Sequence, residues 1–168
     1  MSEKSTYENK VFDHGNIRVV ERSFMELNTS EFISCVFNEL NLEGSNFHFC
    51  TMTDTIFNNV LFYWASFLDN SYKACKFKDV TFAGASFTNV MFEDCTFHNV
   101  KFRPSNLGGG CHFETVEFKN CTFSRTVSIH SELCSETDLP YDITKKMVDR
   151  KSLDLVSGLP RSKPNDEA

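Results

Sequence analysis

The sequence predicts an all-β solenoid, a chain wound into short stacked coils, on the evidence of three columns of residues. In the first column a large apolar residue, most often phenylalanine, recurs at every fifth position from Leu27 to Leu107. Phe113, Phe118 and Phe123 continue this column after one extra residue. A small residue (Cys, Val, Ala or Ser) commonly stands two positions before each large one, and Asp, Asn or Gly often stands two positions after it. The repeated unit is therefore small-x-large-x-(Asp/Asn/Gly).

A period of five residues fits neither a helix nor a long strand. A helix repeats every 3.6 residues, and a strand places residues an odd number apart on opposite faces. The pattern is satisfied if the chain turns a corner once in every unit. The small and large residues, two apart on a short extended segment, then point inward together. Asp, Asn and Gly suit the corner because they tolerate positive φ. A short fixed period of this kind indicates a solenoid.

The repeat resembles the pentapeptide-repeat family in its Phe-rich form, as residues 90–97 (VMFEDCTF) illustrate. The resemblance covers residues 24–125. It implies a right-handed, quadrilateral β-helix with four units in each coil. Seventeen units before the glycine segment and three after it make twenty, which predicts about five coils. Members of such a family share a scaffold but not one function.

The residues before the repeat predict a tail and a cap. Residues 1–10 are polar, and we expect a disordered N-terminal tail. Residues 11–24 contain Phe12 and Ile17 in phase with the repeat, but Arg22 does not suit a core. We therefore expect an irregular coil or hairpin that forms an N-terminal cap over 11–24.

The β-helix is expected over residues 25–129, with the single extra residue accommodated as a bulge at Gly108, Gly109 and Gly110. Residues 130–158 are expected to form a C-terminal capping or dimerisation segment. An apolar stripe with a possible N-cap and a glycine stop predicts a short C-terminal helix over 142–156. Residues 159–168 are expected to be a disordered tail.

Seven cysteines suggest disulfides or metal by number alone, but their positions indicate otherwise. Six occupy the small inward position, where a free thiol packs as a compact apolar group. These are Cys35, Cys50, Cys75, Cys95, Cys111 and Cys121. Cys134 lies outside the repeat and is the candidate for a reactive thiol. Reduced buried thiols favour a cytoplasmic protein.

The sequence predicts no enzyme, no cofactor and no metal site. The inward positions are filled by apolar and small residues, and no phosphate-binding loop or nucleophile motif occurs. His48, His98 and His112 stand next to inward positions and should point outward, away from the cysteines. We therefore expect the outer surface to carry the function.

An outward apolar cluster is the candidate interaction patch. Its members are Phe49, Leu61, Tyr63, Trp64 and Leu68. Contiguous exposed apolar residues commonly mark a binding surface. Alternatively, because Trp64 stands twenty residues from both Gly44 and Gly84, its ring could simply lie over bare backbone.

The leading functional hypothesis is a non-enzymatic protein-interaction scaffold that presents flat β-helix faces to an unidentified protein partner, with a homodimer as a further possibility. The resemblance implies an alternative, a DNA-mimic protein that acts on a type II topoisomerase by protecting or inhibiting gyrase. The repeat supports it by its charge, since eleven acidic and seven basic residues over 24–125 give 7 − 11 = −4. Lys73, Lys76, Lys78 and Lys119 interrupt any acidic track, however.

A second alternative is a luminal or secreted recognition domain. Glycosylation triplets begin at Asn28 and Asn120. No signal peptide is apparent at the start of the sequence, and no window is apolar enough for a membrane span. Direct nucleic-acid binding is not expected either, because there is no basic stripe.

Overall fold

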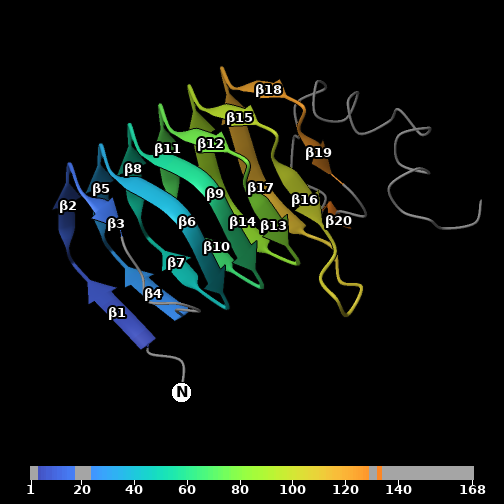
Figure 1. Ribbon diagram of the computed structural model, residues 1–168, viewed down its shortest axis with the longest axis horizontal. Coiled ribbons are helices and arrows are strands. Elements are labelled where there is room, and N and C mark those ends of the chain that lie inside the picture. Colours follow the sequence, from blue (N-terminus) through green and yellow to red (C-terminus); the bar gives the residue numbers. More distant parts are fainter. Residues whose placement is uncertain (1–3, 18–23, 129–131, 134–168) are drawn as a thin grey trace, which may run out of the picture.

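The chain winds into a stack of parallel β coils, and the computed structural model describes residues 4–17, 24–128 and 132–133 of it (Figure 1). Every strand pair is parallel, and no helix occurs within these residues. The coils form a four-sided, all-β solenoid, as the sequence predicted. The segment 134–158, with the helix expected over 142–156, and the tail 159–168 lie outside the described residues.

Two faces of the solenoid belong to an eleven-stranded sheet. The first face contains β1 (Lys4–Glu8), β4 (Phe24–Asn28), β7 (Asn46–His48), β10 (Ser66–Leu68), β20 (Glu132–Leu133) and the first halves of β14 (Ser86–Glu93) and β17 (His112–Lys119). The second face contains β2 (Val11–Asp13), β5 (Glu31–Ile33), β8 (Thr51–Thr53), β11 (Ser71–Lys73) and the second halves of β14 and β17.

The other two faces belong to a nine-stranded sheet. The third face contains β3 (Asn16–Ile17), β12 (Lys76–Lys78), β15 (Thr96–His98), β18 (Thr122–Ser124) and the first halves of β6 (Val36–Glu43) and β9 (Ile56–Tyr63). The fourth face contains β13 (Thr81–Ala83), β16 (Lys101–Arg103), β19 (Val127–Ser128) and the second halves of β6 and β9.

The large inward residues stack into aromatic columns along the axis. Phe77 lies between Phe57 and Phe97, with ring centroids 4.8 Å apart on both sides and interplanar angles of 1° and 3°. Rings on neighbouring faces meet edge to face, as Phe77 and Phe92 do at 77°. Both arrangements are favourable for aromatic pairs. The predicted stacking of the phenylalanines is confirmed.

Each five-residue unit turns a corner at the residue two positions after its large residue, and that corner residue holds positive φ. The values lie close together, from 50° at Asp54 to 65° at Gly44. Asp, Asn and Gly are frequent there, as the sequence predicted, but the backbone imposes the same conformation on Trp64 (53°) and Phe49 (55°). These bulky residues are unusual in the left-handed region.

The N-terminal region departs from the prediction. Residues 1–10 were expected to be a disordered tail, whereas Lys4–Glu8 forms β1 and pairs in register with β4. Residues 11–17 form β2 and β3, which pair in parallel with β5 and β6 rather than making an irregular cap. Tyr7 explains the difference, because it occupies a large inward position twenty residues before Leu27 and packs against Phe12. The coil thus includes residues 4–17, and residues 1–3 and 18–23 lie outside the described residues.

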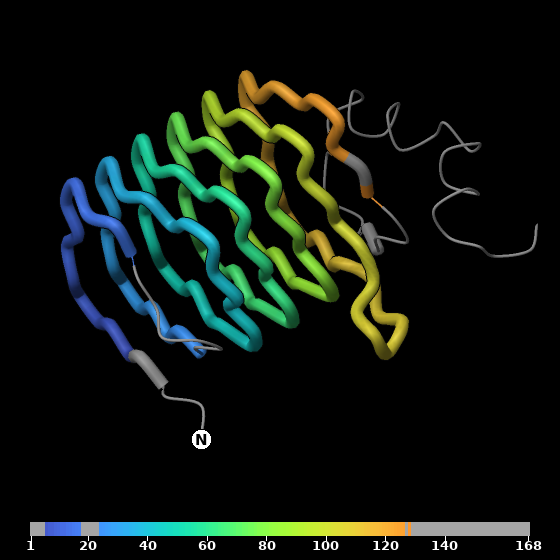
Figure 2. The backbone as a smooth tube through the Cα atoms, viewed as in Figure 1, coloured from blue at the N-terminus to red at the C-terminus, as the bar shows by residue number. Residues whose placement is uncertain are grey.

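The glycine segment also differs from the single-residue bulge that we expected. Ser66 pairs with Ser86, twenty residues later, but Ser86 pairs with His112, twenty-six residues later. The excess is therefore 26 − 20 = 6 residues, and Leu107 is 79% exposed instead of inward. Figure 2 shows the resulting loop, in yellow, projecting from the stack between β16 and β17.

Pro104 gives the physical reason for this loop. It stands two residues after Phe102, the corner position at which Trp64 and Gly84 hold φ of 53° and 60° in the preceding coils. Proline is restricted to φ near −65° and cannot adopt that corner. The chain leaves the coil at Pro104 and re-enters it at Cys111, which is fully buried at the small inward position before Phe113.

Candidate interaction surface

Within the described coils, the interior is filled by side chains and offers no site for a ligand. The large and small inward residues are almost completely buried, and five of the six cysteines of the repeat are among them. Cys121 is the exception and is half-buried, close to the C-terminal end of the stack. Among the described residues, no group of three or more His, Cys, Asp or Glu side chains is arranged to hold a metal ion.

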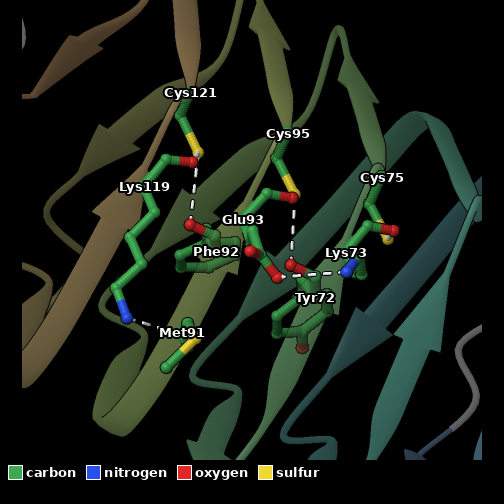
Figure 3. A network of polar contacts seen from close by, with 9 residues as sticks. All are labelled: Tyr72, Lys73, Cys75, Met91, Phe92, Glu93, Cys95, Lys119 and Cys121. Carbon is green, nitrogen blue, oxygen red and sulfur yellow. Dashed lines mark hydrogen bonds and ion pairs between the residues drawn. The ribbon is translucent and has the colours of Figure 1, made fainter.

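The inward cysteines of the third face form a column, shown for Cys75, Cys95 and Cys121 in Figure 3. The Cys95 thiol lies 3.4 Å from the Tyr72 carbonyl oxygen and 3.3 Å from that of Glu93, to which it can donate. Cys121 repeats this geometry one coil later, with the carbonyl oxygens of Phe92 and Lys119. These thiols satisfy backbone acceptors of the coil.

Cys111 and Cys121 are poor nucleophiles in this setting. Burial raises the pKa of Cys111 to about 11. The hydrogen bond with Cys95, followed by burial, raises the pKa of Cys121. Because the thiolate is the reactive form, a raised pKa makes a cysteine inert. The candidate reactive thiol, Cys134, lies outside the described residues.

Phe49 and Leu68, two members of the candidate patch, lie together at the corner between the first and second faces. The Phe49 amide donates to the Leu68 carbonyl oxygen at 2.8 Å. Phe49 follows β7 and is 53% exposed, whereas Leu68 ends β10 and is half-buried. Asp69, the corner residue of the next coil, accepts a hydrogen bond from Asn89.

Leu61, Tyr63 and Trp64 form a separate group at the fourth face. Leu61 and Tyr63 point outward from β9 and are half-buried, and Trp64 occupies the following corner with 44% of its surface exposed. The Tyr63 and Trp64 rings are 4.8 Å apart and inclined at 47°. The structure thus divides the five predicted residues into two groups on either side of the first face.

The loop formed by residues 104–110 packs against this second group. The Tyr63 hydroxyl donates to Asn106 Oδ1 and accepts a hydrogen bond from the Asn106 amide at 2.9 Å. Gly84 lies beneath the loop, where an added Cβ would stand 2.8 Å from Ser105 Cβ and 3.0 Å from Trp64 Cδ1. Ala83 is fully buried although it points outward. Trp64 therefore does lie over a bare glycine, and its other edge stays exposed.

Leu107, at the tip of the loop, is the surface residue that sequence reasoning missed. It is in phase with the repeat and reads as an inward residue, yet it is the most exposed large apolar residue that the structure describes. The missed signal was Pro104, which is incompatible with the corner that the phase of Leu107 would require.

Charged groups of both signs alternate on the faces. On the second face Lys73 lies 3.5 Å from Glu93, and Lys119 lies 3.1 Å from Glu117. Lys76 and Lys78 are exposed on the third face. His98, which we expected to point outward, is exposed and hydrogen-bonds Ser124 at 2.8 Å. The described faces therefore carry no uninterrupted acidic track.

A comparison with known protein families supports the five-residue repeat of the coil. The family model "Pentapeptide repeats" matches residues 30–67 and 73–109 in eight copies. Among solved structures, the chain is similar to the pentapeptide repeat protein Rfr23 from the cyanobacterium Cyanothece 51142. The identity is 11%, the TM-score is 0.47, and the match covers 73% of this chain and 86% of that one.

HetL from Nostoc sp. strain PCC 7120, a pentapeptide repeat protein involved in heterocyst differentiation regulation, has 11% identity and a TM-score of 0.43. That match covers 77% of this chain and 58% of HetL. QnrB1, a plasmid-mediated fluoroquinolone resistance protein, has 13% identity and a TM-score of 0.26, over 88% of this chain and 99% of QnrB1.

No curated protein matches the chain. None of the described residues belongs to a helix that could cross a membrane. Residues 30–67 and 73–109 of this chain are therefore pentapeptide repeats, and their large residues form the observed aromatic columns.

Proposed function

We propose that the protein is a non-enzymatic interaction scaffold that binds a protein partner through its outer surface, with Phe49 and Trp64 as anchors. One observation supports this most. Two aromatic side chains occupy corners that hold φ of 55° and 53°, and they remain 53% and 44% exposed.

The fold gains little from an aromatic residue at these corners. The left-handed conformation costs a residue with a Cβ roughly 1–2 kcal/mol, a cost that glycine avoids and asparagine reduces. Asn59, Asn89 and Asn99 fill equivalent corners elsewhere. The coil imposes this conformation on residues of many types. What distinguishes these two corners is the large apolar surface that they leave exposed, which points to a role outside the fold.

The chemistry of the group formed by Leu61, Tyr63 and Trp64 suits protein recognition. Tryptophan and tyrosine are enriched among residues that dominate binding energy at interfaces, because they combine a large apolar surface with a polar atom. Tyr63 is already held by Asn106, so the neighbouring Trp64 lies in a preorganised setting. Preorganisation lowers the entropic cost of binding.

The experiment is affinity capture from the native host with the full chain, compared with the Tyr63→Ser/Trp64→Ser variant. We expect the wild type to retain a partner that the variant loses, while both give the same β-rich circular dichroism spectrum. A Thr51→Ala/Thr53→Ala variant on the second face is the matched control and should retain the partner. Equal capture by all three proteins would refute the proposal.

Two assays distinguish the alternatives. A DNA mimic would inhibit supercoiling by purified gyrase, whereas we expect no inhibition, because Lys73 and Lys119 pair with the acidic residues of the second face. A luminal domain would carry glycans at Asn28 or Asn120 when produced in a eukaryotic secretory host. We expect a glycan-free mass and a cytoplasmic protein, since the repeat holds buried thiols rather than disulfides.

A further inference from the structure

The positive charges of the repeat are divided unevenly between the sides of the solenoid. Of the seven lysines and arginines in residues 24–125, Lys73 and Lys119 lie on the second face, where each is paired with a glutamate. The other five lie on the third face, the fourth face or the corner between them, and none forms an ion pair with a carboxylate of the described residues. These are Lys76, Lys78, Lys101, Arg103 and Arg125.

Four of these cations gather at the corner between the third and fourth faces. Lys78 precedes this corner in one coil, on β12. Lys101 and Arg103 follow it in the next coil, on β16. Arg125 occupies the corner itself one coil further, with φ of 52°. Adjacent strands are about 4.8 Å apart, so the four cations lie within about 10 Å along the axis. We call these four residues the basic corner.

The basic corner keeps an excess of positive charge. Asp79 is the one carboxylate at this corner in the same three coils, and its Oδ1 atom accepts a hydrogen bond from Asn99 Nδ2 at 2.6 Å. Lys78, Lys101 and Arg125 are exposed. Arg103 is half-buried and donates to the Pro104 carbonyl oxygen at 3.2 Å. Four cations and one carboxylate give 4 − 1 = +3, in a chain whose net charge is −6.

Unpaired cations on an acidic protein favour an anionic partner, and the short extent of the basic corner decides which kind. Two coils nearer the N-terminal end than Asp79, the same corner carries Glu39, and the fourth face carries Glu43. A nucleic acid that continued along the axis would bring its phosphates to these carboxylates, whereas nucleic-acid binding requires an extended basic track. A protein segment with a few clustered carboxylates matches the length of the basic corner.

We propose that the basic corner binds a short acidic segment of a protein partner. Arginine suits this role, because its guanidinium group can bind a carboxylate through two parallel hydrogen bonds. The basic corner lies between the third and fourth faces, whereas Trp64 occupies the corner between the fourth and first faces. The inference therefore goes beyond the proposed function and names a second surface.

Fluorescence anisotropy of a labelled peptide of alternating glutamate and serine residues, titrated with the full chain, tests the inference. We expect saturable binding that weakens as the salt concentration rises. Lys101→Gln/Arg125→Gln should raise the dissociation constant about fivefold or more. Lys73→Gln/Lys119→Gln is the matched control, because it removes the same charge from the second face, and it should change the constant by less than about twofold. No binding, or an equal loss in both variants, would overturn the inference.

Two further measurements address other occupants. Labelled single-stranded DNA of the same net charge should bind more weakly than the peptide, and tighter binding of the DNA would overturn the inference. In sedimentation velocity at low salt, we expect no self-association that Lys101→Gln/Arg125→Gln abolishes. Such self-association would identify the occupant as the acidic side of a second copy and would also overturn it.

The peptide assay separates this inference from the proposed function. Tyr63→Ser/Trp64→Ser should bind the peptide as tightly as the wild type, because neither residue belongs to the basic corner. Equal binding together with lost capture of the native partner would support both proposals. Peptide binding that is lost in Tyr63→Ser/Trp64→Ser would refute the second surface and leave the proposed function intact.

Discussion

Ala74 shows at the level of one residue that stacking, not side-chain preference, sets the corner conformation. Its φ is 52°, the same as in the corners filled by Asn89 and Asn99. Its amide donates to the Glu93 carbonyl oxygen at 2.9 Å, the same bond that Trp64 makes to Ala83. The backbone hydrogen bonds between coils thus impose the left-handed region on residues that avoid it in isolation.

Ala74→Gly is therefore expected to stabilise the protein. Glycine adopts positive φ without strain, so the free energy of unfolding should rise by up to about 1 kcal/mol. Urea denaturation of both proteins measures the difference. Ala85→Gly, at a buried inward position, is the control and should lower stability, because it gains flexibility and loses packing.

Phe77→Ala is expected to cost about 3–5 kcal/mol, the range for truncating a buried phenylalanine. Phe77 is 2% exposed and stacks on both sides at 4.8 Å, so neighbouring coils cannot collapse into the space. The urea midpoint should fall accordingly. A loss below about 1 kcal/mol would mean that the column contributes little to stability.

The buried thiols give stability a dependence on pH. The pKa of Cys111 is about 11 in the folded chain, against 9.0 as its ordinary value. The folded state therefore binds this proton more tightly than the unfolded state, and the stabilisation is complete below about pH 9. The free energy of unfolding should fall between about pH 9 and pH 11, and less steeply in Cys111→Ala. Identical slopes in the two proteins would contradict this origin.

Among the elements, the loop between β16 and β17 shows how a single residue interrupts a regular repeat. Pro104 cannot form the corner, and the chain returns to the coil only after one whole unit and one further residue. Deleting residues 104–109 would join Arg103 to Gly110, which places a glycine at the corner and keeps Cys111 and Phe113 in their positions.

This six-residue deletion should fold, with an unchanged circular dichroism spectrum and a melting temperature within a few degrees of the wild type. The five-residue deletion of 105–109 is the matched control. It retains Pro104 and leaves one residue too many for the coil, so it should be clearly less stable. A higher melting temperature for the five-residue deletion would contradict the conclusion that the loop adds six residues to the coil.

Most of the coil could be predicted from the sequence, because large residues five apart determine which side chains stack. Phe77 and Phe97 illustrate this success. The length of the insertion could not be predicted, because six extra residues equal one repeat unit plus one residue. Leu107 therefore stays in phase with the repeat and looks like one more inward residue. β1 was missed for a different reason, since Tyr7 is a single large residue in phase with the repeat in a polar segment, and pairing with β4 supplies the rest of its stabilisation.

The sequence predicted that the five candidate residues point outward, as they do, but not that they lie in two groups. Periodicity shows that a residue points outward, not what covers it. The contact of Tyr63 with Asn106 depends on the loop, and Ala83 is fully buried although its position in the repeat points outward. Such contacts between outward side chains have no period, so the sequence pattern does not reveal them.

For the whole molecule, the central claim is that separate residues carry the fold and the binding. Inward side chains fill the coil, and we propose that the exposed aromatic corners serve association. The free energy of unfolding of the Phe49→Asn/Trp64→Asn variant tests this most directly. Asparagine accepts the corner conformation, so we expect a value within about 1 kcal/mol of the wild type. A loss comparable to that of Phe77→Ala would show that the two aromatic residues belong to the fold and would contradict the account.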